Sequence, residues 1–202
     1  MPKPNVIAVD VDGVLVEFLS GFERAFEATI GRPAVRISPS WALDIAYGIT
    51  AAELDAVWRA VASMRIYRDL PPLPGAFEAL QMLDDAGYEV HAVTAIEPQY
   101  WDDRYENLSA LGFKGNSIHA VGHGPKTPVL QQLRPVLFAD DQVKHLHQAP
   151  FVPNRVWIHT QDEQFPEVGG VHTHEAPSLL EFVQHWLEDA HHHLETPVAK
   201  VA

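Results

Sequence analysis

Residues Val6–Val14 read VIAVDVDGV, an apolar run that ends abruptly in two aspartates and a glycine. The β-branched residues in this run are typical of a buried parallel strand, and Gly13 lets the backbone turn sharply after it. Ligands of open α/β sheets bind at the carboxyl ends of the strands. Asp10 and Asp12 can therefore face one pocket, where two neighbouring negative charges favour a bound cation or a shared proton. Taken alone, the stretch is also compatible with a solvated, Asp-rich turn.

The composition restricts the classes of partner. Lys and Arg number 14 against 27 Asp and Glu, which gives a net charge of −13 at pH 7 over 202 residues. So acidic a surface repels nucleic-acid polymers and anionic membranes, and we expect neither as a partner. The chain has no Cys, which excludes disulfides, thiolate metal sites and cysteine nucleophiles. No apolar run reaches membrane-spanning length and we find no signal peptide, so we expect a cytoplasmic protein.

Hydrophobic periodicity predicts alternating strands and helices from residue 88 onward, and hence a parallel sheet with helices on its faces. The predicted helices span 16–30, 51–63, 76–86, 98–111 and 177–190, with short ones after Lys126 and Asp141, and the further strands span 88–94, 117–121, 136–139 and 155–159. Thr127 is the expected N-cap of the helix after Lys126. Residues 32–48 read as irregular. More than seventy residues separate the first two strands, too many for one crossover helix, so we expect an inserted helical subdomain at 16–73 and a core formed by 1–15 and 74–202.

Several predicted strands end in chemically reactive side chains. Strands end at Asp10 and Asp12, at Thr94, and at Asp140 and Asp141, and Lys126 opens a helix between the last two strands. The carboxyl ends of parallel strands meet at one edge of a sheet, so these groups are expected to lie together. Carboxylates bind a hard cation such as Mg²⁺, while a hydroxyl and an ammonium suit the oxygens of a phosphoryl group.

This set of motifs resembles the haloacid dehalogenase (HAD) superfamily of phosphohydrolases, whose four motifs match Asp10-Val-Asp12-Gly-Val, Thr94, Lys126 and Asp140-Asp141. Within that superfamily the chain is most similar to the 5′(3′)-deoxyribonucleotidase-like group, through the stretches DVDGVLVEF (10–18) and YRDLPPLPGA (67–76). The resemblance covers residues 5 to 160. It implies a Rossmann-like parallel sheet flanked by helices, with a small helical cap inserted after the first strand.

The resemblance also implies a two-step phosphomonoester hydrolysis. Asp10 would attack phosphorus and form an aspartyl-phosphate, while Asp12 would protonate the leaving oxygen and then activate the hydrolytic water. Mg²⁺ would be held by the Asp10 carboxylate, the Asp12 carbonyl and an acid of the fourth motif. We expect Asp140 to be the direct ligand and Asp141 to support it. A second acid at Asp12 favours phosphate chemistry over the dehalogenase branch of the superfamily, which lacks it.

The resemblance assigns the remaining groups to the substrate. Thr94, the Ala95 amide and Lys126 would hold the phosphoryl oxygens. Phe18 matches an aromatic residue that stacks on the nucleobase, and Trp41 is a second candidate. The expected partner is a small phosphorylated substrate such as a nucleoside monophosphate. The residues Ala95-Ile96 depart from the group, which often has a hydroxyl side chain directly after the Thr94 position.

Other residues have an ordinary interpretation beside a functional one. Phe22 and Phe26 are expected in the core of the cap. Arg65 and Arg68 could reach a substrate anion, but the ordinary interpretation is that they are solvated or paired with local acids. Several histidines are candidate metal or rim residues: His119, His123, His172, His174 and His191–His193. For the last three, a position near a helix C-terminus is the stronger interpretation, because cations are favoured there.

Three alternatives accompany the leading prediction of a Mg²⁺-dependent nucleotidase. The first is a phosphatase of sugar phosphates or other metabolites. The second is a response-regulator receiver, which also uses acids, a Thr and a Lys on a parallel sheet. In a receiver, however, the phosphorylated Asp follows a middle strand and no long insertion follows it. The third is a catalytically silent HAD-like binding module, against which the complete motif set argues.

Overall fold

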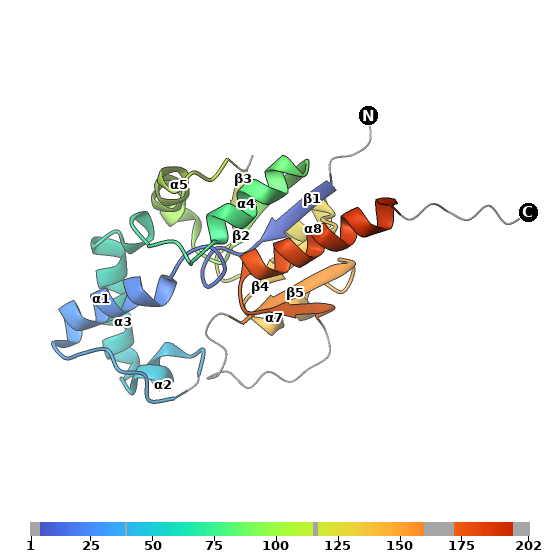
Figure 1. The fold of residues 1–202 in the computed structure, drawn as a ribbon. Helices are drawn as coiled ribbons and strands as arrows, with labels where there is room; N and C mark the ends of the chain where they lie inside the picture. The colour runs from blue at the N-terminus through green and yellow to red at the C-terminus, as the bar shows by residue number, and fades with distance from the viewer. Residues whose placement is uncertain (1–4, 39, 115–116, 160–171, 196–202) are drawn as a thin grey trace, which may run out of the picture.

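The computed structural model describes residues 5–38, 40–114, 117–159 and 172–195. Six parallel strands form one sheet in the order β3-β2-β1-β4-β5-β6 (Figure 1). The strands are β1 (Asn5–Val9), β2 (Tyr88–Thr94), β3 (Ser117–Ala120), β4 (Leu137–Asp140), β5 (Asn154–Ile158) and β6 (His174–Ala176). The expected parallel α/β fold is confirmed.

Strand β1 lies at the centre of the sheet. Ile7 pairs with Val90 of β2 on one side and with Leu137 of β4 on the other. Ile7, Ala8 and Val9 have no exposed surface, as a strand covered on both faces requires. The strand order reverses between β1 and β4, and at such a point the flanking connections separate and leave a crevice at the carboxyl ends.

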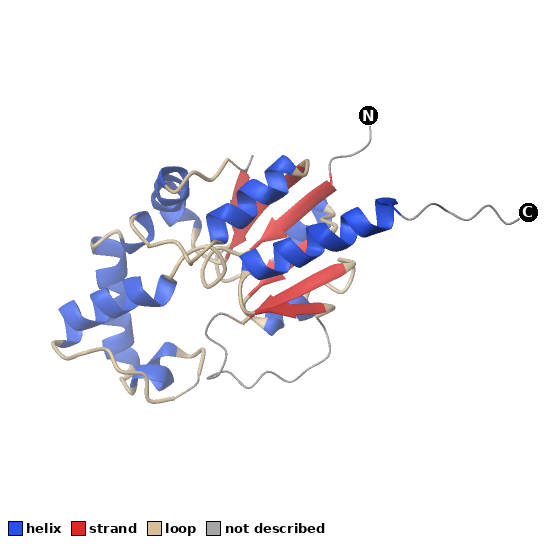
Figure 2. Cartoon of the chain, viewed as in Figure 1, coloured by secondary structure: helices blue, strands red, loops and turns tan. Residues whose placement is uncertain are grey.

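Helices cover both faces of the sheet (Figure 2). The helices α4 (Ala76–Asp85), α5 (Trp101–Ala110) and α8 (Leu179–Glu195) belong to the larger core cluster, and α6 (Thr127–Leu133) and α7 (Val143–His147) close the smaller cluster on the opposite face. The smaller cluster contains Ala8, Leu130 and Phe138, which contribute from β1, α6 and β4 respectively. In the described part of the chain, no helix has the length and apolar character needed to cross a membrane.

Residues 16–73, which we call the helical insert, contain α1 (Phe18–Ile30), α2 (Leu43–Tyr47), α3 (Ala51–Ser63) and the short 3-10 helix η1 (Ile66–Arg68). These helices project beyond the carboxyl edge of the sheet (Figure 1). Phe22 and Phe26 of α1 are fully buried, and both rings contact Tyr47. The helix α3 has the predicted bounds 51–63, and Thr50 and Glu53 form a capping box that starts it.

The structure corrects several local predictions. The 32–48 stretch contains the short helix α2, and β6 was not predicted. A 3-10 turn, η2 (Pro98–Tyr100), precedes α5. Lys126 occupies the N-cap position of α6, and the hydroxyl of Thr127 instead donates to the carbonyl of Gln148 at 2.9 Å. Pro128 occupies an early position of the helix, where its missing N–H has no consequence, so α6 starts without a side-chain cap.

Candidate active site

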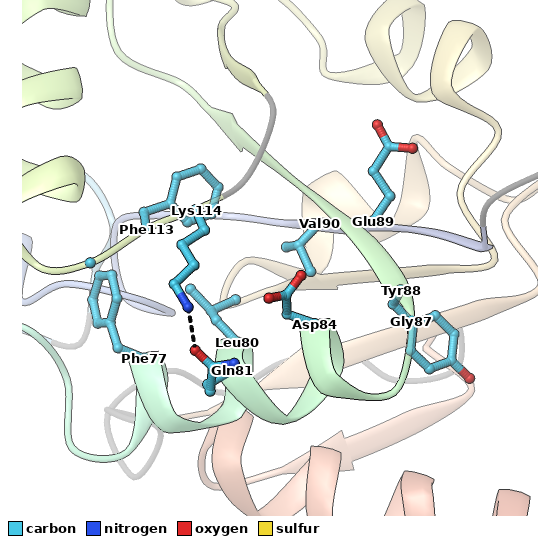
Figure 3. A pocket seen from close by; sticks show the side chains of 11 residues that line it. Phe77, Leu80, Gln81, Asp84, Gly87, Tyr88, Glu89, Val90, Phe113 and Lys114 are labelled. Atoms are coloured by element: carbon cyan, nitrogen blue, oxygen red, sulfur yellow. Dashed lines mark hydrogen bonds between the residues drawn. The ribbon is translucent and has the colours of Figure 1, made fainter.

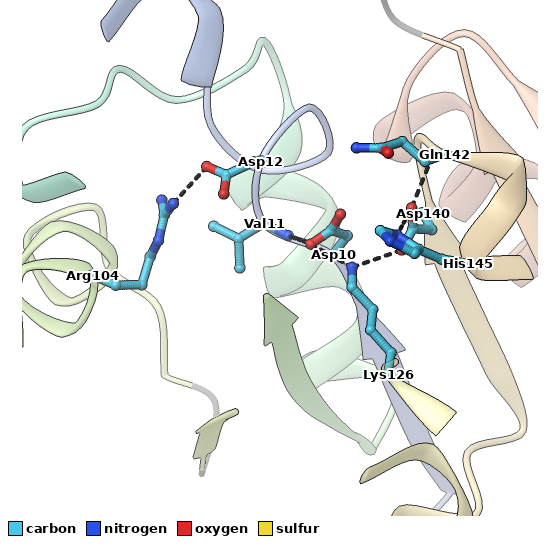
Figure 4. A network of polar contacts seen from close by, with 8 residues as sticks. All are labelled: Asp10, Val11, Asp12, Arg104, Lys126, Asp140, Gln142 and His145. Carbon is cyan, nitrogen blue, oxygen red and sulfur yellow. Dashed lines mark hydrogen bonds and ion pairs between the residues drawn. The ribbon is translucent and has the colours of Figure 1, made fainter. Parts of the chain in front are cut away.

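The reactive residues predicted from the motifs come together at the carboxyl edge of the sheet. Asp10 directly follows β1, Thr94 is the last residue of β2, and Asp140 is the last residue of β4. Lys126 reaches the same place from the start of α6. The Lys126 ammonium lies 2.8 Å from Asp10 Oδ1 and 2.7 Å from Asp140 Oδ2, so one buried cation joins the two central strands (Figure 4).

Further contacts fix these carboxylates. The Val11 N–H donates to Asp10 Oδ1 at 2.7 Å, and the Gln142 N–H donates to Asp140 Oδ1 at 2.8 Å. His145 Nδ1 lies 3.0 Å and 3.1 Å from the two Asp140 oxygens. Both oxygens of Asp140 are therefore engaged by protein groups. Sequence reasoning missed His145, although its place on the helix directly after the Asp140-Asp141 pair is a usable signal.

Asp141 has different surroundings from its neighbour. Its side chain is buried, and its Oδ1 has no hydrogen-bond partner among the described residues. The carboxylate packs against Gly13, which has φ +80°, and a Cβ at Gly13 would lie 2.2 Å from Asp141 Oδ2. Glycine is required at this position for both reasons. The Asp141 carbonyl accepts from Trp157 Nε1 at 3.1 Å, which fixes the backbone after β4.

Burial and neighbouring charges shift the pKa values of the three acids in different directions. Burial raises the pKa of Asp10 to about 6, against the opposing effect of Lys126. Burial raises the pKa of Asp141 well above its usual value, and Asp10 and Asp140 raise it further. Burial alone would also raise the pKa of Asp140, but Lys126 and His145 overcome it and lower that pKa to about 2. The charges of Asp10 and Asp140 in turn raise the pKa of Lys126 despite its burial.

Three of these residues form a group with the dimensions of a metal site. Asp10, Asp140 and His145 each offer a ligand atom, and these atoms lie within 4.8 Å of one another. The Lys126 ammonium already lies between the two carboxylates, however, and would repel a cation placed there. Asp10 and Asp141 fit a hard cation better, because both line the open cavity and both carry raised pKa values that a cation would lower.

A cavity of about 580 Å³ opens above the acids and runs under the helical insert. Phe18 and Trp41, the two predicted substrate residues, both line it. So do three aromatic residues that the sequence analysis did not single out, Trp58, Tyr67 and Tyr100. The Phe18 ring lies 6.0 Å from Trp58 and 5.9 Å from Tyr67, nearly parallel to each.

Asp12 lies on the cavity wall and faces away from Asp10 (Figure 4). Its carboxylate meets Arg104 of α5 at 2.5 Å, and the Arg104 side chain has no exposed surface. Ala95 also lines the cavity, whereas Thr94 is fully buried behind it with a hydroxyl that lacks a partner among the described residues. Nothing in the sequence pattern indicated the Arg104 contact.

The remaining candidates lie in other surroundings. Arg65 and Arg68 pair with acids of α5, Asp103 and Glu106 respectively, as the ordinary interpretation predicts. His123 lines the cavity and lies 3.1 Å from Glu97, whereas His119 faces His91 at 3.2 Å. His172 and His174 pack against aromatic rings of Trp157, Phe182 and Trp186. His191–His193 belong to α8, but their side chains lie outside the described residues.

A second, smaller hollow of about 280 Å³ lies at the opposite end of β2 from Thr94 (Figure 3). Phe77, Leu80 and Phe113 line it, and Lys114 donates to Gln81 at its edge at 2.9 Å. It has none of the motif residues, so the chemistry of the chain is concentrated at the carboxyl edge of the sheet.

The fold matches solved structures of the HAD superfamily. A haloacid dehalogenase-like family hydrolase from Streptococcus pneumoniae aligns with a TM-score of 0.66 and 17% identity, over 92% of this chain and 100% of that one. A HAD family hydrolase from Deinococcus radiodurans, solved with bound phosphate and sodium, aligns with a TM-score of 0.63 and 17% identity, over 94% of this chain and 98% of that one. The L-2-haloacid dehalogenase of Xanthobacter autotrophicus aligns with a TM-score of 0.63 and 16% identity, over 90% of this chain and 98% of that one. At these identities the likeness shows the fold alone.

Sequence comparison is more specific. A protein of Bacillus cereus named "Putative nucleotidase" is 25% identical over 118 residues, which span 57% of this chain and 62% of that relative. The sequence model of one family matches residues 4–119, more than half of the chain, and covers the helical insert and the first two motifs. The chain belongs to that family, the 5′ nucleotidase, deoxy (pyrimidine), cytosolic type C proteins, and is built on the HAD fold.

Proposed function

We propose that this chain is a Mg²⁺-dependent phosphomonoester hydrolase that forms an aspartyl-phosphate on Asp10 and acts on small nucleoside monophosphates. The observation that carries the proposal is the arrangement at the base of the cavity. There, the buried Lys126 ammonium holds Asp10 and Asp140, while an oxygen of the neighbouring Asp141 has no hydrogen-bond partner among the described residues. Family membership supports a nucleotide as substrate.

In the first step, Asp10 attacks phosphorus. Lys126 and the Val11 N–H both bind Oδ1, which leaves Oδ2 as the attacking oxygen. A bond forms between Oδ2 and phosphorus as the bond to the leaving oxygen breaks, and Asp12 gives that oxygen its proton. In the second step, Asp12 takes a proton from a water molecule that attacks the same phosphorus, and the Asp10 carboxylate and inorganic phosphate are released.

For the metal, we reverse the order expected from the sequence and propose Asp141, with Asp10 and the Asp12 carbonyl, as the residues that hold Mg²⁺. Asp140 then holds Lys126 in place. The unpartnered Asp141 oxygen and the engaged Asp140 carboxylate support this assignment. When bound, Mg²⁺ would neutralise charge on the phosphoryl oxygens and align phosphorus with Asp10.

The phosphoryl oxygens have two further donors in the proposal, the Thr94 hydroxyl and the Ala95 amide. The Thr94 hydroxyl is buried and has no partner in the described part of the chain, which supports its part, because buried polar groups normally have a hydrogen-bond partner. The aromatic lining of the cavity favours a flat nucleobase over a sugar, since rings gain by stacking on a π-face. Sugar phosphates remain the alternative substrate class. We place the activity in the cytoplasm, in line with the cytosolic type named for the family.

The test is an assay of purified protein with p-nitrophenyl phosphate, in Mg²⁺ and in EDTA. We expect Mg²⁺-dependent turnover that falls by a factor on the order of 10³ or more in Asp10→Asn, because the nucleophile is lost. Asp85→Asn is the matched control, since it makes the same change at an exposed acid whose hydrogen bond is with Gln81. Folded protein that binds Mg²⁺ and hydrolyses no phosphoester would refute the proposal in favour of a silent binding module.

A panel of 5′- and 3′-nucleoside monophosphates and sugar phosphates then separates the two substrate classes. Phe18→Ala should weaken nucleotide turnover and spare p-nitrophenyl phosphate if a base stacks on that ring. Equal losses on every substrate would favour the metabolite alternative. Chloride release from 2-chloropropionate serves as the counter-assay for dehalogenase chemistry, which we expect to be absent.

A further inference from the structure

Arg104 occupies an unusual position for a charged side chain. It extends from α5 and has no exposed surface, and among the described residues it is the largest of the fully buried side chains. Its Nη2 meets Asp12 Oδ1 at 2.5 Å, and Nε and Nη1 have no hydrogen-bond partner among the described residues. In the described part of the chain, Asp12 is the acid with which it forms an ion pair.

Stability alone gives no reason for this arrangement. Removing a guanidinium from water costs several kcal/mol, and the loss is recovered only when its remaining donors are also satisfied. Here two of the three nitrogens lack a hydrogen-bond partner within the described part of the chain. An apolar side chain of similar length would fill the same space without that penalty. The value of Arg104 must therefore lie in what it does to Asp12.

Arg104 also connects the loop that carries Asp12 to the helical insert. The guanidinium carbon lies 5.2 Å from the centre of the Tyr67 ring, and Tyr67 belongs to η1 and lines the cavity. The centre of the Tyr67 ring also lies 5.9 Å from that of the Phe18 ring. The Arg104 side chain thus contacts both Asp12 and Tyr67, so its position depends on a residue that lines the cavity.

In-line phosphoryl transfer defines where Asp12 must lie. The leaving oxygen departs on the side of phosphorus opposite the attacking Asp10 oxygen, so the proton donor has to lie away from Asp10. Asp12 faces away from Asp10 and toward Arg104 in this way (Figure 4). We propose that Arg104 is a positioning residue that aims the Asp12 carboxylate at the leaving oxygen. The inference rests on the phosphatase function proposed above.

The dependence on the leaving group tests this proposal. p-Nitrophenolate is a stable anion and leaves without a proton, whereas an alkyl oxygen, as in a nucleoside 5′-phosphate, needs one. The ratio kcat/KM reports the steps up to release of the leaving group, while kcat also includes hydrolysis of the aspartyl-phosphate. We would measure both quantities on both substrates for wild type, Arg104→Met and Asp12→Asn.

Arg104→Met should lower kcat/KM for the alkyl phosphate by about 10- to 100-fold, because a misaimed acid loses most of its effect. For p-nitrophenyl phosphate, kcat/KM should stay within about twofold of wild type, since no proton is required. In the Asp12→Asn background, Arg104→Met should cause no further loss, because the two residues act as one unit. Arg104→Lys should restore part of the alkyl phosphate activity.

Arg65→Met is the matched control. Arg65 also joins the insert to α5, through Asp103, but does not touch Asp12. We expect it to leave the ratio between the two substrates unchanged. Circular dichroism and thermal unfolding should show that Arg104→Met is folded. If that variant loses both substrates equally while folded, or adds to the Asp12→Asn defect, the positioning role is wrong. If wild type hydrolyses neither substrate, the failure belongs to the proposed function instead.

Discussion

Asp140 and Asp141 are adjacent in the sequence, but the protein uses them differently. Asp140 is held by Lys126, His145 and a backbone N–H, whereas an Asp141 oxygen has no partner in the described part of the chain. Consecutive residues at the end of a strand point to opposite sides. One carboxylate therefore faces the buried lysine and the other faces the cavity.

This difference predicts unequal effects of the same substitution. Asp141→Asn should raise the Mg²⁺ concentration for half-maximal activity by about 100-fold or more, because it weakens the ligand proposed to bind Mg²⁺ directly. Asp140→Asn should raise it by about 10-fold and destabilise the protein by about 3–5 kcal/mol, since Lys126 keeps its charge and loses a buried partner. Activity titrated with Mg²⁺, together with urea unfolding, measures both effects. The reverse ranking would restore Asp140 as the ligand.

The sequence predicted which residues gather at this edge but not which pairs they form. Asp10, Lys126 and Asp140 meet because the ends of parallel strands and the starts of the following helices share one edge, and that follows from the pattern. The Asp12–Arg104 pair was not predictable in this way. Arg104 lies inside a helix, and its direction depends on how α5 packs against η1.

At the scale of elements, the helical insert depends on aromatic packing. α1 packs against α3, and the fully buried rings of Phe22 and Phe26 in α1 contact Tyr47, the last residue of α2. Arg32 lies over the Phe26 ring at 4.9 Å. The four-residue spacing of these rings in the sequence already placed them on one face of the helix.

Phe26→Ala should therefore destabilise the protein by about 3–5 kcal/mol, because it leaves a cavity where surrounding rings cannot collapse. Urea or thermal unfolding measures the change. Phe151→Ala provides the comparison, since that ring is 44% exposed and its loss should alter stability by less than about 0.5 kcal/mol. Equal effects for the two variants would mean that the insert contributes little to global stability.

Helices and strands were predicted correctly where the hydrophobic pattern extends over many residues, and were missed where it covers only a few. The helix α3 begins and ends at the predicted residues, 51 and 63. The five residues of α2 and the three of β6 are too few to show a period, and both elements exist because the rest of the fold supports them. Thr127 resembles an N-cap, but Gln148 offers its hydroxyl a tertiary partner.

For the molecule as a whole, the excess of negative charge is the dominant long-range effect. With a net charge of −13, the compact state repels itself more than the expanded chain does. We expect the melting temperature, measured in EDTA, to rise by a few degrees between about 10 and 150 mM NaCl, as the screening length shortens to about 8 Å. A melting temperature that falls with salt would show that local ion pairs outweigh the net charge.

The central position of β1 has a consequence for how the chain reaches its native state. β1 ends at Val9, yet its two neighbours in the sheet begin only at Tyr88 and Leu137. During synthesis, β1 is made long before the strands that pair with it. The helical insert, which follows β1 in the chain, can meanwhile pack around its own aromatic residues. Such long-range pairing is slow, and until it occurs the apolar β1 segment is exposed and prone to aggregation. Folding speed and dependence on chaperones, more than final stability, should therefore limit the yield of active protein in the cell.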